Sequence, residues 1–161
     1  MPLLLARVDD RLIHGQVAFG WAGTLRPTWI AIVSDALRQD SGRAALYLLA
    51  APDGVRAVVL SVAEALDPAL LATIERERAF VLFQGPEEAL RLREGGFPLA
   101  ELNIGGLHFS EGRRPVLPFV YLDESDRGCL KRLAALGVRL VAQDLPTNPT
   151  HRLEPLLDLA G

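Results

Sequence analysis

Short apolar runs alternate with segments that carry helix signals along the whole chain, and this alternation limits the possible folds more than any other feature. Each run is short, as buried strands are. The expected strands are 3–6, 29–33, 57–60, 80–83, 101–104, 119–122 and 138–141. Strands that alternate with helices usually run parallel, with helices packed on both faces of the sheet. We therefore predict an α/β fold: a single domain over residues 1–161, with a mainly parallel sheet of about six to seven strands.

Local signals mark the helices between these strands. Ser61 and Glu64 have the spacing of a capping box, in which each side chain bonds the other's backbone amide. Asp123 can cap a later helix that Gly137 ends. The expected helices lie after Asp40 and over 68–78, 86–94, 126–136 and 153–159. The apolar side of the helix after Asp40 is expected to comprise Ala44, Ala45, Leu48 and Leu49.

Composition excludes several classes of protein. The net charge of -3 is unlike the basic excess of a general nucleic-acid binder, and the single cysteine, Cys129, precludes an internal disulfide. No run approaches the ~18 apolar residues that span a membrane. The segment before Arg7 is too short for a signal peptide. We expect a cytoplasmic protein with no nucleic-acid partner and no direct membrane insertion.

The run from Arg7 to Val17, R-V-D-D-R-L-I-H-G-Q-V, places one histidine between a strand and a helix. The strand is the run 3–6. Apolar residues at every fourth position from Val17 to Leu25 mark one face of the helix. The N-terminus of a helix favours an anion, because it has free N–H groups and the positive end of the dipole. His14, with Arg11 three residues before it, therefore suggests phosphate chemistry.

The same run resembles the N-terminal signature of the IIB subunits of the mannose/fructose/sorbose-type sugar phosphotransferase system. Later blocks extend the resemblance along the chain: Ala50-Ala51-Pro52-Asp53-Gly54-Val55, Leu60-Ser61-Val62, Asn103-Ile104-Gly105-Gly106, Leu122-Asp123-Glu124-Ser125-Asp126, Leu130-Lys131-Arg132-Leu133 and Gly137-Val138. In that family the histidine of the motif is phosphorylated, so the resemblance implies that His14 is a phosphocarrier.

The resemblance also implies partners. His14 would accept a phosphoryl group from a phosphohistidine on a IIA protein or domain and pass it to a sugar held by membrane IIC and IID subunits. The protein would then be a protein-phosphohistidine–sugar phosphotransferase, peripheral to the membrane through IIC and IID, with no metal or organic cofactor. The sugar, the phosphorylated ring nitrogen, and the choice between a monomer and a homo-oligomer stay open. An alternative is a regulatory or binding module with the same fold and no sugar transfer.

Residue chemistry gives each member of the motif a candidate role. A neutral imidazole is nucleophilic near neutral pH, which suits His14 to phosphoryl transfer. Arg11 can grip two phosphoryl oxygens with its planar fork. Asp9 or Asp10 could orient the imidazole through its other nitrogen, and Gly15 could let the backbone approach a phosphate. Structural interpretations compete: a hydrogen-bonded turn histidine, helix capping by the two aspartates, and a tight turn at the glycine.

Other candidates should gather near His14, because ligands of such sheets bind outside the carboxyl ends of the strands. These are Asp35, Gln84, Gly105, Gly106 and Asp144. The glycine pair is interpreted either as a phosphate cradle or as a tight turn. A solvated loop is expected to carry His108, Arg113 and Arg114, with a phosphorylated partner as the alternative contact of the arginines, and His151 is expected at the surface. No H-x-x-x-H spacing predicts a metal site, and neither G-x-G-x-x-G nor G-x-x-x-x-G-K-[ST] is present to indicate a nucleotide.

Two departures from the family pattern bear on the site. Phe19-Gly20 stands where family members often carry polar residues. The segment from Gln143 to Asn148 replaces a Val-Pro-x-Asp turn that often has a basic residue nearby. Arg11 would then carry more of the phosphoryl charge, helped by Arg7 or by an arginine of the 113–114 loop.

Overall fold

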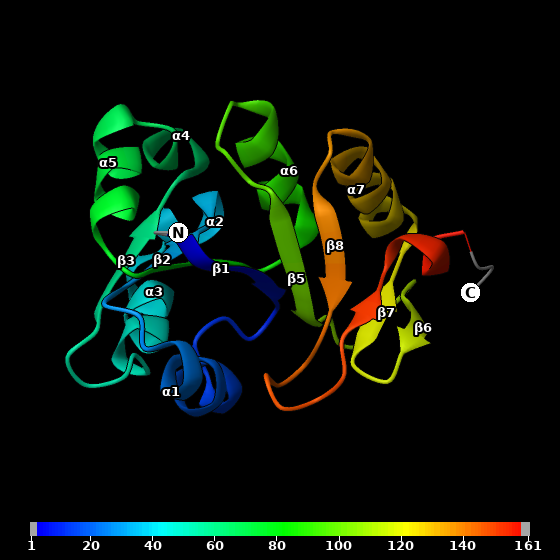
Figure 1. The fold of residues 1–161 in the computed structure, drawn as a ribbon, viewed down its shortest axis with the longest axis horizontal. Coiled ribbons are helices and arrows are strands. Elements are labelled where there is room, and N and C mark those ends of the chain that lie inside the picture. Colours follow the sequence, from blue (N-terminus) through cyan, green and yellow to red (C-terminus); the bar gives the residue numbers. More distant parts are fainter. Residues whose placement is uncertain (1–2, 159–161) are drawn as a thin grey trace.

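The computed structural model describes residues 3–158 and has a central sheet with helices on both sides (Figure 1). The sheet has seven strands in the order β3-β2-β4-β1-β5-β8-β9. The strands are β1 (Leu3–Asp9), β2 (Trp29–Val33), β3 (Arg56–Leu60), β4 (Ala79–Phe83), β5 (Glu101–Gly106), β8 (Arg139–Ala142) and β9 (His151–Arg152). Every neighbouring pair from β3 to β8 is parallel, and β9 runs antiparallel to β8. The predicted mainly parallel sheet is confirmed.

The helices divide between the two faces. One face carries η1 (Gln16–Trp21, a π-helix), α1 (Ala22–Leu25), α2 (Asp35–Arg38) and α3 (Ser41–Leu49). The other carries α4 (Val62–Ala65), α5 (Pro68–Arg76), α6 (Pro86–Glu94) and α7 (Glu124–Ala135), which line one side of the view in Figure 1. Side chains alternate across each strand, so Ile30 and Ile32 of β2 pack towards the first group while Ala31 and Val33 pack towards the second. Two apolar cores result, one on each face.

The predicted caps are confirmed. The Glu64 amide donates to Ser61 Oγ at 3.0 Å, and the Ser61 amide donates to Glu64 Oε1 at 2.9 Å. Asp123 forms a second capping box at the start of α7. Such boxes satisfy amides that the first helical turn leaves without partners.

Two expected elements differ in the structure. Residues 119–122 are not a strand of the main sheet: β7 (Val120–Leu122) pairs antiparallel with β6 (Arg114–Leu117), where a loop was expected. A two-residue connection lets this hairpin form locally, while β8 occupies the edge of β5. Where a helix over 153–159 was expected, the structure has only the 3₁₀ turn η2 (Glu154–Leu156). Residue 159 of the expected helix lies outside the described residues.

Candidate functional site

Strand β1 is longer than expected, and the added residues build the site. The apolar run ends at Ala6, yet β1 continues to Asp9 because its later residues pair with both β4 and β5. Alternation places Ala6 and Val8 in the core under α6 and α7. Arg7 and Asp9 therefore lie on the opposite face, beneath η1, where they are 0% and 1% exposed. A cation and an anion are thus buried side by side.

A short turn carries the chain from Asp9 back to His14. The Leu12 amide donates to the Asp9 carbonyl at 2.9 Å, and Leu12 adopts a φ of 55°, in the left-handed region. That conformation costs a non-glycine residue roughly 1–2 kcal/mol. Complete burial of the Leu12 side chain, together with Ile13, offsets the strain. The turn is therefore held by packing, and His14 follows it immediately before η1.

Asp9 fixes the orientation of the His14 ring. His14 Nε2 lies 2.8 Å from Asp9 Oδ2, and the Gln16 amide donates to His14 Nδ1 at 3.3 Å. Because Nδ1 accepts a hydrogen bond, a neutral imidazole here carries its proton on Nε2 and donates it to the carboxylate. The lone pair of Nδ1 is then the nucleophilic position of the ring.

Asp9 stays ionised despite its burial. Desolvation pushes its pKa upward, but the hydrogen bonds from His14 and from the Arg11 amide, and the charges of His14 and Arg7, outweigh it. The net result is a pKa below the ordinary value for an aspartate. The carboxylate can therefore hold a proton on His14 Nε2 without taking it.

Arg11 and Gly15 lie at the rim of this arrangement. The Arg11 amide and Nε donate to Asp9 Oδ1 at 3.0 and 3.3 Å, and its half-exposed guanidinium donates to Gln16 Oε1 at 2.9 Å. Gly15 has an ordinary right-handed conformation, and a Cβ there would meet no atom within 4 Å. The backbone conformation of the turn therefore does not require glycine at this position. Gly15 lines an open space next to His14.

Asp10 contacts a different histidine. Its carboxylate accepts the His108 amide at 2.8 Å and lies 2.7 Å from His108 Nδ1. The expectation that either aspartate could orient His14 therefore narrows to Asp9, because Asp9 ends the strand while Asp10 turns towards the 107–113 loop. The Asp10–His108 contact therefore ties the 107–113 loop to the motif.

Gly105 and Gly106, the last two residues of β5, have a role that neither sequence interpretation included. A Cβ on Gly105 would overlap the Arg7 guanidinium, and one on Gly106 would lie 3.1 Å from the Asp9 carboxylate. Both glycines therefore provide space for the buried ion pair. The alternation of Arg7 and Asp9 along one strand face was the sequence signal for this pair.

The remaining predicted site residues are distributed differently. Asp144 joins the cluster through its backbone carbonyl, which accepts bonds from Arg7 and from Trp21 Nε1, each at 2.9 Å. Asp35 instead bonds the Val62 amide and Arg91. Gln84, Arg113, Arg114 and His151 also lie away from His14.

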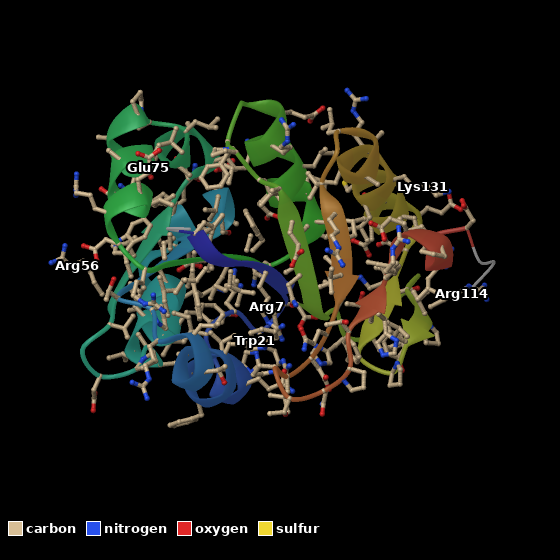
Figure 2. The ribbon with its side chains drawn as sticks, viewed as in Figure 1. Arg7, Trp21, Arg56, Glu75, Arg114 and Lys131 are labelled. Carbon is tan, nitrogen blue, oxygen red and sulfur yellow. The ribbon has the colours of Figure 1, made fainter. Side chains whose placement is uncertain are left out.

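Gln84 lines a separate hollow with Asp10 and Arg113. Arg113 bonds Asp126, and Arg114 on β6 lies far from Arg7 in Figure 2. His151 is exposed on β9. Arg7, expected as one possible helper of Arg11, is fully buried and bonds protein oxygens through both terminal nitrogens, so it does not reach a phosphoryl group directly.

An open hollow of about 390 Å³ adjoins His14. It is lined by His14, Gly15, Ala18, Phe19 and residues 50–53. Phe19 is 83% exposed, and the neighbouring helix α3 exposes Leu46 and Leu49. Ala45 and Leu49 were expected on the apolar side of this helix, but α3 buries Ala44 and leaves both of them exposed. Of these exposed side chains Phe19 lines the hollow itself, and an exposed apolar group beside a polar centre favours contact with a partner.

Two kinds of feature are absent from residues 3–158. No three histidine, cysteine or acidic side chains in this part of the chain gather closely enough to hold a metal ion. No helix in the same range combines the length and the apolar composition needed to cross a bilayer.

The chain matches the family described as PTS system sorbose subfamily IIB component over residues 3–161. It is 37% identical over 158 residues to the sorbose-specific EIIB component of Lacticaseibacillus casei, covering 98% of this chain and 96% of that protein. The mannose-specific EIIAB component of Escherichia coli (strain K12) is also 37% identical over 157 residues, and the chain spans 49% of its length.

A solved structure has the same fold. The IIBSor domain of the sorbose permease from Klebsiella pneumoniae superposes with a TM-score of 0.90 at 32% identity, over 98% of this chain and 97% of that domain. The sequence match to the family extends over residues 3–161, and the likeness in fold covers 98% of the chain. The chain therefore belongs to the sorbose subfamily of IIB components of the sugar phosphotransferase system, and its role lies in sugar phosphotransfer.

Proposed function

We propose that the chain acts over residues 1–161 as one IIB-type phosphocarrier domain, with His14 as the phosphorylated residue. It receives the phosphoryl group from a IIA phosphohistidine and delivers it to a sugar bound by IIC and IID subunits, as a protein-N(π)-phosphohistidine–sugar phosphotransferase. The observation that carries the proposal is the 2.8 Å contact between His14 Nε2 and the buried Asp9 carboxylate. This contact occupies Nε2, and Nδ1 becomes the nucleophile when the longer 3.3 Å bond from the Gln16 amide breaks.

The transfer follows from that arrangement. The Nδ1 lone pair of His14 attacks the phosphorus, and the bond between phosphorus and the donor nitrogen breaks with its electron pair returning to the donor ring. The His14 ring gains positive charge while it keeps the proton on Nε2, and Asp9 compensates that charge. In the onward step the sugar hydroxyl oxygen attacks the phosphorus and forms the new P–O bond, the phosphorus–Nδ1 electron pair returns to the His14 ring, and the hydroxyl proton goes to a base of the sugar site. Asp9 thus supports both steps without a proton transfer.

Arg11 and Gly15 suit the phosphoryl group itself. Arg11 has a half-exposed guanidinium tied to Asp9 on one side and to Gln16 on the other, so it lies next to the ring with little freedom. A planar fork can bond two phosphoryl oxygens as charge moves between donor and acceptor. Gly15 has no side chain and lines the hollow next to His14, which leaves more room there for an incoming group.

The apolar hollow supports docking of protein partners. A IIA donor must bring its own histidine to His14, and Phe19 with residues 50–53 surrounds that approach. An exposed aromatic ring buries a large apolar area on contact, which makes it a natural anchor. We expect the protein to work in the cytoplasm, reaching the membrane through IIC and IID, with no cofactor of its own.

The test is phosphorylation of the purified chain. Labelled phosphoenolpyruvate, the general phosphotransfer proteins and a IIA donor should give an acid-labile, base-stable adduct that maps to the peptide holding His14. His14→Ala should lose it, while His151→Ala, on the exposed strand β9, should keep it. Equal labelling of wild type and His14→Ala would refute the proposal. Labelling without onward transfer, in membranes holding the matching IIC and IID, would favour the regulatory module.

A further inference from the structure

Arg7 lies at the centre of the site although it never reaches the surface. Its Nη1 donates to Asn103 Oδ1 at 2.6 Å and to the Gln143 carbonyl at 2.9 Å. Its Nη2 donates to the Asp144 carbonyl at 2.9 Å and to Asp9 Oδ2 at 3.3 Å. One guanidinium therefore joins β1, β5 and the segment that follows β8.

The oxygen that Arg7 contacts is also the oxygen that holds His14. Asp9 Oδ2 accepts from Arg7 Nη2 at 3.3 Å and lies 2.8 Å from His14 Nε2. Without Arg7, Asp9 would keep only the half-exposed Arg11 as a cationic partner, and this buried carboxylate would become more basic and compete for the imidazole proton. A second donor on the same oxygen withdraws electron density from it and fixes its direction. Arg7 thus acts on His14 through a single shared atom.

The surrounding structure accommodates this cation specifically. The Trp21 ring of η1 lies 5.0 Å from Arg7 Cζ, a cation–π distance, and Figure 2 shows the two side chains close together beneath β1. The absence of a side chain at Gly105 leaves space for the guanidinium. Burial lowers the pKa of Arg7 to about 10, against the opposing effect of Asp9, so the group remains charged at neutral pH.

A buried cation is expensive unless it is fully paired, and replacing it with apolar packing is often neutral or stabilising. Stability alone therefore does not account for it. We propose that Arg7 is a positioning residue for phosphoryl transfer: it keeps Asp9 anionic and aimed at Nε2, and it fastens the Gln143–Asp144 segment and Trp21 around His14. The inference rests on the proposed function of His14.

The first arm of the test does not involve phosphate. Ring ¹⁵N shifts of His14 and the carboxyl ¹³C shift of Asp9 are followed against pH in wild type, Arg7→Met, Arg7→Lys and Gly105→Ala. Wild type should show the Nε2–H tautomer. Arg7→Met and Gly105→Ala should show a mixture of tautomers and an Asp9 that titrates at higher pH. Arg7→Lys, which keeps the charge without the fork, should lie between them.

The second arm measures the single-turnover rate of transfer from IIA to His14. We expect a loss of about 10²-fold for Arg7→Met and Gly105→Ala, the usual cost of a misplaced reacting group, with partial rescue by Arg7→Lys. Gly128→Ala on α7 is the matched glycine control, because a Cβ there meets no atom within 4 Å, and it should behave as wild type. If Arg7→Met fails to fold, Gly105→Ala and Arg7→Lys decide the question.

The two failures are distinguishable. Folded variants with wild-type tautomer, wild-type Asp9 titration and wild-type transfer rate would overturn the positioning role while leaving His14 a phosphocarrier. A loss of melting temperature with unchanged tautomer and rate would make Arg7 purely structural and would also overturn it. A wild-type protein that never becomes labelled on His14 would instead overturn the proposed function.

Discussion

Two consecutive aspartates each hold a histidine, yet the two pairs differ in every other respect. The Asp9–His14 and Asp10–His108 contacts have similar lengths, 2.8 and 2.7 Å. Asp9 is buried and shared with two arginines, whereas the Asp10 side chain is 25% exposed. The His14 side chain is 17% exposed and that of His108 46%. Burial and shared cations, rather than the pairing itself, separate a candidate reactive centre from a loop clamp.

The two pairs also use opposite ring nitrogens. Asp9 contacts Nε2 of His14, whereas Asp10 contacts Nδ1 of His108. The backbone amide of His108 binds the same carboxylate, as expected when a side chain fixes a loop. His108 therefore matches the motif in composition but has the geometry of a structural contact.

The largest effect on phosphoryl transfer should come from replacing each histidine singly with glutamine. His14→Gln should abolish the acid-labile adduct, because no other nucleophile lies at that position. His108→Gln should keep the transfer rate within about threefold of wild type, as surface substitutions usually do. Quench-flow labelling with a IIA donor measures both. Loss of labelling in His108→Gln with retention in His14→Gln would invert the comparison.

Removal of the charge from each aspartate should give the next largest effect. Asp9→Asn can donate to Nε2 and so favours the wrong tautomer, and we expect the transfer rate to fall by about 10²- to 10⁴-fold. Asp10→Asn keeps an acceptor for the His108 amide, and its rate should stay within about threefold of wild type. Single-turnover kinetics decide between them, and comparable losses in both variants would show that the two pairs act as one unit.

The exposed aromatic rings next to each histidine provide a smaller contrast. Phe19 lies beside His14, and Phe109, which follows His108, is 74% exposed and packs edge-to-face on Tyr121. Phe19→Ser should weaken binding of the IIA donor by about tenfold, since an aromatic anchor contributes more than about 1 kcal/mol. Phe109→Ser should not weaken it. Titration calorimetry measures both affinities, and a larger loss for Phe109→Ser would move the docking surface away from His14.

The smallest effect concerns stability at low pH. The pKa of Asp9 is lower in the folded protein than in the unfolded chain. Between these two pKa values the unfolded chain therefore binds more protons than the folded protein. The stabilisation by Asp9 is therefore complete above its unfolded pKa and is lost as the pH falls through the folded pKa. Urea unfolding between pH 6 and about pH 3 should show a shallower decline for Asp9→Asn than for wild type. Parallel declines would indicate that Asp9 titrates normally.

Much of the sheet could be predicted because its signals are local. A run such as 29–33 is apolar on both faces, and the Ser61–Glu64 box needs only three residues of spacing. The hairpin of β6 and β7 was not predicted, because residues 114–117 mix charge and proline and pair only with their neighbour. Local sequence patterns predict where a strand lies more readily than which strand it pairs with.

The chemistry of the site was predictable only in part. The motif singled out His14 and Arg11, but the choice between Asp9 and Asp10 depends on where β1 ends. The burial of Arg7 depends on oxygens of residues 103, 143 and 144, which are distant in sequence and meet only when β1, β5 and β8 align. The 143–148 segment contributes backbone carbonyls to this cluster, where a basic side chain would have been sought.

The ring nitrogen that carries phosphate tests the central claim most directly. Heteronuclear ¹⁵N–³¹P NMR of the freshly phosphorylated protein distinguishes the two nitrogens of His14. If Asp9 holds Nε2 as the 2.8 Å contact indicates, the phosphoryl group should be on Nδ1, with the Nε2 proton still bonded to the carboxylate. A phosphoryl group on Nε2 would require the Asp9 contact to break, and it would contradict the account.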